Sequence, residues 1–252
     1  MSKGSGVLSD RQDAYGHLLY DFYNGVDNVE IVEREDGYFD TSRMGPTTYF
    51  AEFSDWEDHQ KAAIKHACGR VLDIGCGAGR HSLYLQQQGH EVLGIDNSPL
   101  AIQVCKQRKL KNTSAVPITK LNSKFGVFNT IIMMGHNFGL VGSYKRAKWL
   151  LRRFSSMTPN DGIIIAETMD PYRTENPIHL AYHQYNRERG RMSGQLRLRI
   201  RYKIYATPWF DYLFVSKSEL EDILVGTGWI IERYIDSDKP TYIAILRKRV
   251  MS

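Results

Sequence analysis

The chain has 252 residues, a hydrophobic fraction of 42% and a formal net charge of +5. This composition is sufficient for one large domain with a sizeable core and excludes wholesale disorder. The modest positive charge permits an anionic substrate without requiring nucleic acid. No apolar run approaches the ~18 residues that span a bilayer, and the N-terminal residues lack the apolar core of a signal peptide. The cysteines are scattered without C-x-x-C spacing, which argues against a disulfide framework or a zinc site: Cys68, Cys76 and Cys105. We therefore expect a cytoplasmic protein with no membrane partner and no metal.

The first elements come before a glycine-rich stretch. Residues 10–24 carry aromatic and leucine side chains at helical spacing, with Asp10 as a candidate cap and Gly25 as the stop. These aromatics either cover a ligand cleft or pack against the edge of a sheet. Residues 27–60 are expected to be irregular until a helix begins at Asp55 and leads into the core.

The glycine-rich stretch predicts a nucleoside site. Residues 71–74 form a short apolar strand, and three glycines follow within five residues: Gly75, Gly77 and Gly79. Residues 80–88 read as a helix, and residues 91–95 as a second strand that ends at Asp96. A carboxylate in this position of a βαβ unit accepts hydrogen bonds from both ribose hydroxyls.

The spacing of the glycines selects the kind of nucleoside. It is G-x-G-x-G rather than the G-x-G-x-x-G of dinucleotide sites, and Asp73 stands two residues before Gly75. An acid there repels a pyrophosphate but suits an ammonium or sulfonium group. With Asp73, the glycines and Asp96, the chain resembles the class I S-adenosylmethionine-dependent methyltransferases. The alternative is a glycine-rich turn in a different nucleotide-binding fold.

The resemblance implies an α/β fold with a Rossmann-like, doubly wound, seven-stranded sheet whose last strand is antiparallel. It further implies an N-terminal helical cover (1–60), a cofactor-binding core (61–170), a substrate-side insertion with a lid and a β-hairpin after the fifth strand (171–215), and a segment that completes the core (216–252). The implied cofactor is S-adenosyl-L-methionine, and its product is S-adenosyl-L-homocysteine. The residues that the resemblance assigns to the cofactor are Tyr49, Asp73, Gly75, Cys76, Gly77, Gly79, Arg80, Asp96, Asn97, Leu121, Met134 and Gly135.

The middle of the chain continues the alternating pattern. Ser98 is a candidate cap for the next helix, and a weak strand follows at 114–118. That strand lacks the acid with which such enzymes commonly hold adenine, so main chain near Leu121 is the substitute that we expect. A buried strand at 128–134 leads to a polar loop, and a basic helix at 143–156 precedes a strand at 163–166.

The polar loop and the end of the next strand supply the candidate catalytic residues: His136, Asn137 and Glu167. A histidine accepts a proton near neutral pH, an asparagine orients an acceptor, and a glutamate serves as a base or holds an amine. The competing interpretation is that His136 only hydrogen-bonds its own loop.

The insertion contains two strands, near 197–203 and 210–215, and the first of them has a wholly basic face. Such a stripe attracts an acidic substrate, lies in solvent or contacts another subunit. His179 and His183 are spaced for a metal on a helix, but no third ligand supports one. A capped helix at 216–225 and strands at 229–234 and 242–246 complete the chain.

Together these features predict methyl transfer by in-line displacement to a small-molecule acceptor, in a protein that is a candidate homodimer. Two alternatives stay open: an RNA methyltransferase that uses the basic 187–203 stripe, and a non-catalytic protein that binds S-adenosylmethionine.

Overall fold

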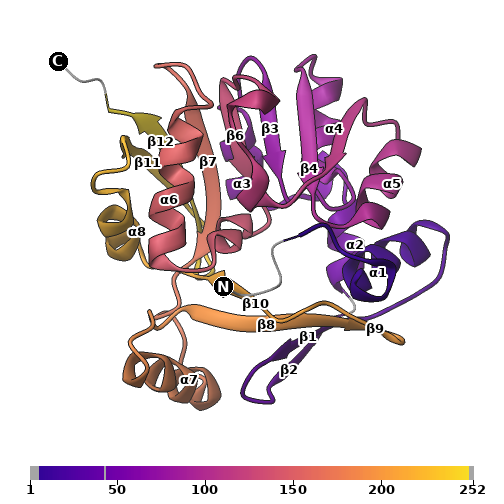
Figure 1. Cartoon of the computed structure of the whole chain (residues 1–252), viewed down its shortest axis with the longest axis vertical. Coiled ribbons are helices and arrows are strands. Elements are labelled where there is room, and N and C mark those ends of the chain that lie inside the picture. Colours follow the sequence, from indigo (N-terminus) through magenta and orange to yellow (C-terminus); the bar gives the residue numbers. More distant parts are fainter. Residues whose placement is uncertain (1–5, 43, 250–252) are drawn as a thin grey trace. The chain divides into compact units, whose positions relative to one another are not determined.

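The computed structural model describes residues 6–42 and 44–249 (Figure 1). Its first five residues, which belong to the segment without a signal-peptide pattern, lie outside the described part. The main sheet has seven strands in the order β11-β12-β7-β6-β3-β4-β5. Their bounds are β3 (Val71–Ile74), β4 (Val92–Asp96), β5 (Asn112–Ala115), β6 (Thr130–Met133), β7 (Ile163–Met169), β11 (Trp229–Asp236) and β12 (Thr241–Lys248).

Strand direction confirms the predicted class of fold. β4 runs parallel to β3 and β5, and β6 runs parallel to β7. β12 lies between β7 and β11 and is antiparallel to both. The chain therefore has the Rossmann-like sheet with one inserted antiparallel strand, and parallel strands of this kind end at one edge where ligands bind.

The helices have the bounds α1 (Ala14–Tyr23), α2 (Met44–Phe50), α3 (Asp58–Ile64), α4 (Arg80–Gln87), α5 (Pro99–Gln107), α6 (Tyr144–Ser155), α7 (Pro177–Glu188) and α8 (Lys217–Leu224). Short 3-10 turns are η1 (Asp10–Gln12), η2 (Phe53–Asp55), η3 (Ile118–Lys120), η4 (Ser123–Phe125) and η5 (Asn137–Val141). The expected caps are confirmed for α5, where the Ser98 side chain accepts from Ala101 N–H, and for α8, where Ser216 and Glu219 form a capping box.

A second sheet corrects the expectation that residues 27–60 are irregular. β1 (Glu30–Arg34) and β2 (Phe39–Ser42) form an antiparallel hairpin, and β1 also pairs with β8 (Gln195–Tyr202). β9 (Tyr205–Ala206) pairs with β8, and β10 (Phe210–Leu213) completes the order β10-β8-β1-β2. The strand that carries the basic residues is therefore part of a larger sheet as well as of the predicted insertion.

Three boundaries also differ from the expected ones. Asp13, not Asp10, caps the first helix, because η1 occupies the preceding turn. α3 begins at Asp58, after η2 has used Asp55. β7 extends to Met169, so Glu167 lies inside the strand and not at its end.

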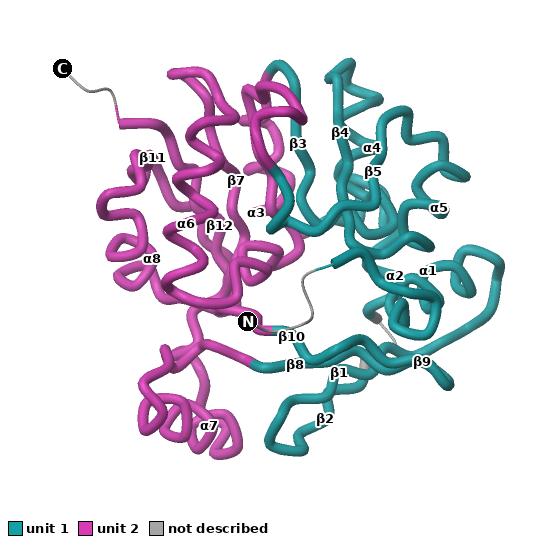
Figure 2. The backbone as a smooth tube through the Cα atoms, viewed as in Figure 1, with its two compact units in different colours: residues 1–56, 69–121, 197–210 teal, residues 57–68, 122–196, 211–252 magenta. Residues whose placement is uncertain are grey.

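The chain divides into two compact units (Figure 2). Unit 1 comprises residues 1–56, 69–121 and 197–210, and unit 2 comprises residues 57–68, 122–196 and 211–252. Within 6–42 and 44–249, no helix is long and apolar enough to cross a membrane. The same residues contain no cluster of His, Cys, Asp and Glu side chains that could hold a metal ion.

Candidate functional site

In unit 1, the glycine loop connects β3 to α4 and folds back on the end of β4. The amides of Gly75 and Cys76 both donate to Ile95 O, at 2.9 and 3.0 Å. Gly77 has a φ of +53°, and a Cβ built on it would lie 2.8 Å from the Tyr15 hydroxyl. Only glycine meets both requirements without strain, so the loop sequence follows from its close contact with α1.

Asp96 closes the other side of this loop. Its Oδ2 accepts from Gly77 N–H at 3.1 Å and its Oδ1 from Ser98 N–H at 2.9 Å. Burial raises the pKa of Asp96 to about 6, a shift that these two amides limit and the nearby Asp13 increases. Each carboxylate oxygen keeps a lone pair beyond its amide donor, so the group can still accept hydrogen bonds from a diol.

Asp73 is more deeply buried than the resemblance implies for a residue that meets an ammonium group. The residue is 2% exposed, and its Oδ2 accepts from the Ser82 hydroxyl at 2.6 Å. Burial raises its pKa to about 7, with a further contribution from Asp96, although Ser82 opposes the shift. The two acids of the motif thus titrate near neutral pH, chiefly because burial disfavours their charged forms.

Two residues at the C-terminal end of α5 donate hydrogen bonds to carbonyl groups of the glycine loop. Cys105 Sγ donates to Gly77 O at 3.1 Å, and Arg108 Nη1 donates to Ala78 O at 2.7 Å. The Ala78 N–H belongs to the same trans peptide as Gly77 C=O, and the two groups point in opposite directions. Because Gly77 O faces Cys105 of α5, the Ala78 N–H points away from α5. Ala78 is 1% exposed, and its N–H has no acceptor among the residues that the structure describes. A buried donor of this kind requires a partner, and a bound ligand can provide it.

The N-terminal segment packs against the glycine loop. The buried Asp13 side chain accepts from Gly16 N–H and from Leu100 N–H, both at 3.0 Å, and so ties α1 to α5. The Tyr15 ring meets the Tyr49 ring edge-on at 5.3 Å, and the Tyr49 hydroxyl donates to Glu30 Oε2 at 2.8 Å. Burial raises the pKa of Tyr15, with further contributions from nearby acids, so its hydroxyl stays protonated.

Three other predicted cofactor residues have contacts of different kinds. Asn97 is partly exposed, and its carbonyl accepts from Leu8 N–H at 3.0 Å. Leu121 is fully buried, and its N–H donates to Ile118 O at 3.3 Å within a turn. Arg80 points away from the loop: its Nη1 donates to Thr48 O at 3.0 Å and its guanidinium lies 5.0 Å from the Trp56 ring.

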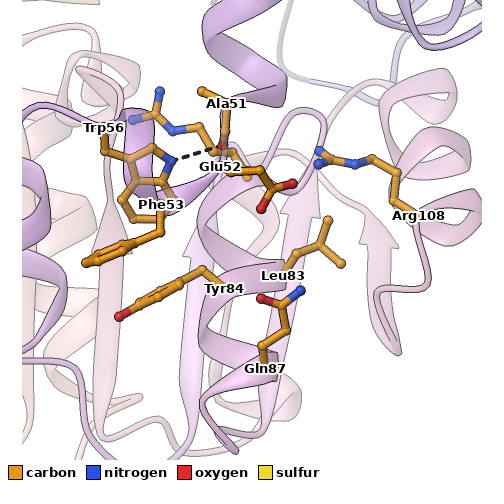
Figure 3. A pocket seen from close by; sticks show the side chains of 9 residues that line it. Ala51, Glu52, Phe53, Trp56, Leu83, Tyr84, Gln87 and Arg108 are labelled. Carbon is orange, nitrogen blue, oxygen red and sulfur yellow. Dashed lines mark hydrogen bonds between the residues drawn. The ribbon is translucent and has the colours of Figure 1, made fainter.

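Arg80 lines a separate cavity of about 240 Å³ on the α4 side of unit 1 (Figure 3). There the Phe53 and Tyr84 rings stack at 4.4 Å, and the Trp56 indole donates to Ala51 O at 3.0 Å. Since Arg80 is engaged with this segment, its direct role is to fix the segment before α3 against the first turn of α4.

In unit 2, Glu167 is the centre of a buried cluster. It is 1% exposed, accepts from Gly135 N–H at 2.6 Å, and accepts from Gln60 Nε2 at 2.9 and 3.0 Å. Burial alone would raise its pKa, but these donors and the imidazoles of His59 and His136 outweigh burial and lower the pKa to about 2. A carboxylate with such a pKa is a poor proton acceptor at neutral pH, which argues for a structural role and against the predicted base.

His136 lies on the loop that Glu167 holds. Its backbone is left-handed, with φ of +65°, a conformation that non-glycine residues rarely adopt. The imidazole Nε2 lies 3.0 Å from Thr241 Oγ1, and the backbone carbonyl accepts from the Tyr212 hydroxyl at 2.6 Å. The part-exposed imidazole is therefore held by Thr241 and its backbone by Tyr212, and a group that meets an acceptor requires a fixed position of this kind.

The remaining predicted residues of unit 2 adjoin this loop. Met134 is buried, Gly135 is exposed with φ of +68°, and Asn137 begins η5. Farther along η5, a Cβ built on Gly139 would lie 2.1 Å from the Tyr212 ring. Tyr212 therefore packs directly on the backbone of the loop.

The basic stripe is partly neutralised by two acids, Glu33 and Asp21. Arg199 and Arg201 both pair with the Glu33 carboxylate on the adjacent β1, and Lys203 pairs with Asp21 at 2.6 Å. The hydrogen bond from Arg199, followed by that from Arg201, lowers the pKa of Glu33 to about 2 although burial opposes the shift. A stripe paired in this way attracts a polyanion less strongly than an unpaired one.

Sequence reasoning missed the residues that support the site. They are Asp13, Tyr15 as a loop contact, Gln60, Cys105, Arg108, Tyr212 and Thr241. The Asp-x-x-Gly spacing at the start of α1 is a capping signal for Asp13. The others come from segments distant in sequence, and no local pattern marks them.

Comparison with known proteins agrees with this geometry. Residues 71–162 match the family model described as a methyltransferase domain. A 2-heptyl-1-hydroxyquinolin-4(1H)-one methyltransferase of Mycobacteroides abscessus is 40% identical over 70 residues, which cover 25% of this chain and 31% of that protein. A glycine/sarcosine N-methyltransferase of Parasynechococcus marenigrum is 28% identical over 109 residues, which cover 41% of this chain and 39% of its own length. The chain thus matches only about a third of the length of each of these curated relatives.

Among solved structures, a methyltransferase from Bacteroides fragilis in complex with S-adenosyl-L-homocysteine superposes with a TM-score of 0.83 at 25% identity. The match covers 99% of this chain and 100% of that one. The chain therefore carries a methyltransferase domain and has the fold of the class I S-adenosylmethionine-dependent methyltransferases.

Proposed function

We propose that the protein is an S-adenosylmethionine-dependent methyltransferase with a small-molecule acceptor. The observation that carries the proposal is the glycine loop of unit 1, where Asp96 stands beside Gly77 and the buried Ala78 N–H lacks an acceptor among the described residues. The first group accepts from a ribose diol, and the second donates to an oxygen of the same ligand. The cofactor named for the Bacteroides fragilis structure contains both kinds of partner.

Each part of the loop has a role in this proposal. Asp96 accepts from the ribose hydroxyls, Asp73 favours the positive charge of the ligand, and Tyr15 covers the bound molecule from α1. Cys105 and Arg108 act as positioning residues, because they hold the loop carbonyls and not the ligand. Bound S-adenosylmethionine supplies a methyl group activated by a cationic sulfur, so the protein has to align an acceptor and exclude water.

His136 and Asn137 are the proposed acceptor-side residues. His136 is held by Thr241 and Tyr212, and its loop is anchored to Glu167 through the Gly135 amide. An imidazole fixed in this way can orient an acceptor or take its proton. Glu167 is assigned to positioning, because its low pKa and burial disfavour proton transfer.

A small-molecule acceptor is favoured over RNA by the paired stripe. Glu33 offsets one of the two positive charges of Arg199 and Arg201, and Asp21 pairs with Lys203. The two curated relatives named above act on a hydroxyquinolone and on glycine or sarcosine, which are small molecules. If RNA is the acceptor instead, its affinity will fall steeply as salt is raised, because phosphate contacts release counterions.

The proposal extends to the location and assembly of the protein. We propose a cytoplasmic enzyme, which is supported by three cysteines that are free even though Cys76 and Cys105 Sγ atoms lie 3.9 Å apart. A homodimer is proposed from the sequence alone, and sedimentation velocity tests it.

The decisive experiment has two stages. Calorimetry with S-adenosylhomocysteine tests the cofactor site, and single-turnover transfer from methyl-labelled S-adenosylmethionine into a metabolite extract tests the activity. Binding with labelled product supports the enzyme. Binding without product from any extract, including total RNA, supports the non-catalytic alternative, and failure to bind rejects the proposal.

A further inference from the structure

Unit 2 contains a polar cavity of about 460 Å³, within the usual size of small-molecule sites. It is lined by Asp170 and Arg173 after β7, Lys217 at the start of α8, Asp236 at the end of β11, and Thr241 and Tyr242 of β12. Four of these six side chains are of acidic or basic residues. Such a lining suits a polar ligand and disfavours an apolar one.

The cavity adjoins the proposed acceptor-side group. Asp170 directly follows β7, so the cavity lies at the carboxyl end of that strand, the edge at which parallel sheets bind ligands. Thr241 lines the cavity, and its hydroxyl lies 3.0 Å from His136 Nε2. A molecule in the cavity is thus one side chain away from His136.

The charges of the lining are only partly paired. Lys217 Nζ contacts both carboxylate oxygens of Asp236, at 2.7 and 2.9 Å, so these two charges cancel. Asp170 accepts from Tyr172 N–H at 2.9 Å, and Arg173 donates to Lys239 O at 3.0 Å. Neither Asp170 nor Arg173 has an ion-pair partner among residues 6–42 and 44–249. One anionic and one cationic group therefore remain for a ligand.

We propose that this cavity binds the methyl acceptor and that the acceptor is a zwitterionic amine of the amino-acid type. Its ammonium group pairs with Asp170 and its carboxylate with Arg173, which can bind it through two parallel hydrogen bonds. The inference rests on the proposed function and deepens it. For transfer, the ammonium first loses a proton, which the His136 imidazole can take. The amine lone pair then forms the N–C bond while the S–C bond breaks with its electron pair on sulfur, and the positive charge passes from sulfur to nitrogen.

Saturation-transfer NMR on the full chain tests the proposal. The probe is a mixture of the proteinogenic L-amino acids at millimolar concentration, with saturating S-adenosylhomocysteine present so that the cofactor loop cannot capture an amino acid. We expect at least one amino acid to bind. Its N-acetyl derivative and its carboxamide should each bind on the order of tenfold more weakly, because each lacks one charged partner.

Two variants assign the contacts. Asp170→Asn should remove the preference for the free amine over the N-acetyl form, and Arg173→Gln should remove the preference for the carboxylate over the carboxamide. The matched controls Asp238→Asn and Arg249→Gln change exposed charges outside the cavity and should keep both preferences.

Three results would overturn the inference: no amino acid binds, the derivatives bind as well as the parent, or folded Asp170→Asn protein keeps the amine preference. The wild-type comparison of derivatives needs no substitution, so a variant that fails to fold leaves the test intact. If S-adenosylhomocysteine binds in calorimetry but no amino acid does, the inference fails and the proposed function survives. If S-adenosylhomocysteine does not bind, the proposed function itself fails.

Discussion

Asp96 Oδ2 accepts the Gly77 amide proton at 3.1 Å, so the end of β4 and the glycine loop share one carboxylate. The residue thus has two duties in the proposed site: it orders the loop and it accepts from the ligand. Removing the carboxylate should affect both, because the loop amide loses its acceptor at the same time as the ribose does.

Asp96→Ala should weaken S-adenosylhomocysteine binding by on the order of a hundredfold or more, the equivalent of two or more lost hydrogen bonds to a charged group. Isothermal calorimetry measures the effect. Asp161→Ala, at an exposed turn, is the control and should bind as the wild type does. Unchanged affinity in Asp96→Ala would remove the cofactor assignment.

Cofactor affinity should rise with pH across neutrality. Burial raises the pKa of Asp96 to about 6 and that of Asp73 to about 7, from an ordinary value of 3.8. These groups stabilise the free protein fully below pH 3.8, and that contribution is lost as pH rises through about 6 and 7. S-adenosylmethionine carries a cationic sulfur and favours the ionised forms of both acids. Its binding near pH 6 should therefore release protons, by up to about one per group.

Calorimetry in buffers with different ionisation enthalpies counts these protons. We expect affinity to increase by up to about tenfold per pH unit for each group below its pKa and to level off above both values. An affinity that is flat across this range would show that neither acid is coupled to the ligand.

Cys105→Ala should weaken cofactor binding by roughly three- to tenfold, since Gly77 O loses its donor and the Ala78 amide is less well aligned. Cys105→Ser restores a donor and should recover most of the affinity, which a simple packing role would not predict. Cys68→Ala removes an exposed thiol and is the control. Equal losses in the alanine and serine variants would contradict the positioning role.

Glu167→Gln should lower the free energy of unfolding at neutral pH by on the order of 3 kcal/mol, because a buried and fully bonded carboxylate is lost. The folded pKa of Glu167 is depressed to about 2 from 4.5. Its contribution is therefore present above pH 4.5 and is lost as pH falls from there towards 2.

Urea unfolding at several pH values measures this contribution. The stability difference between wild type and Glu167→Gln should shrink as the pH is lowered through the window between the two pKa values. A constant difference would mean that the carboxylate is not held in its charged form.

His136→Ala should abolish or strongly reduce methyl transfer while S-adenosylhomocysteine affinity stays within about twofold of the wild type, since general-base catalysis is worth ~10²–10⁴-fold. Single-turnover assays and calorimetry on the same preparation separate the two effects. Thr241→Val keeps the shape of the side chain and removes its hydrogen bond, so it should give an intermediate loss. Full activity in His136→Ala would remove the residue from the site.

Patterns formed by adjacent residues were sufficient to predict the core of the fold. The apolar run before Gly75, the capping serines at Ser98 and Ser216, and the acid at the end of β4 are all features of adjacent residues, and the structure contains the elements that they predict. The inserted antiparallel strand followed from the resemblance, because periodicity does not encode strand direction.

The β1–β2 hairpin escaped prediction because its inward side chains are polar. Glu30 is satisfied by Tyr49, and Glu33 by Arg199 and Arg201. Alternation of apolar and polar residues marks a strand only when burial follows hydrophobicity. Here the partners that permit burial of the acids come from 19 residues away for Glu30 and 166 or more for Glu33.

The role of Glu167 could not be predicted from the sequence for the same reason. Its position near the end of a strand resembles that of a catalytic base, whereas its chemistry is set by Gln60 and the Gly135 amide, which are 107 and 32 residues away. Glu167 could be nominated as a candidate from sequence, but its protonation state depended on donors that only the folded chain assembles.

The contact between Gly139 and Tyr212 makes the residues allowed at position 139 depend on the residue at position 212. Any side chain at 139 would meet the aromatic ring at 2.1 Å, and the same tyrosine hydroxyl holds the His136 carbonyl. A side chain at 139 is thus blocked unless residue 212 becomes smaller. A mutant library that varies the loop alone should return glycine at 139, whereas one that also shrinks residue 212 should tolerate other residues there.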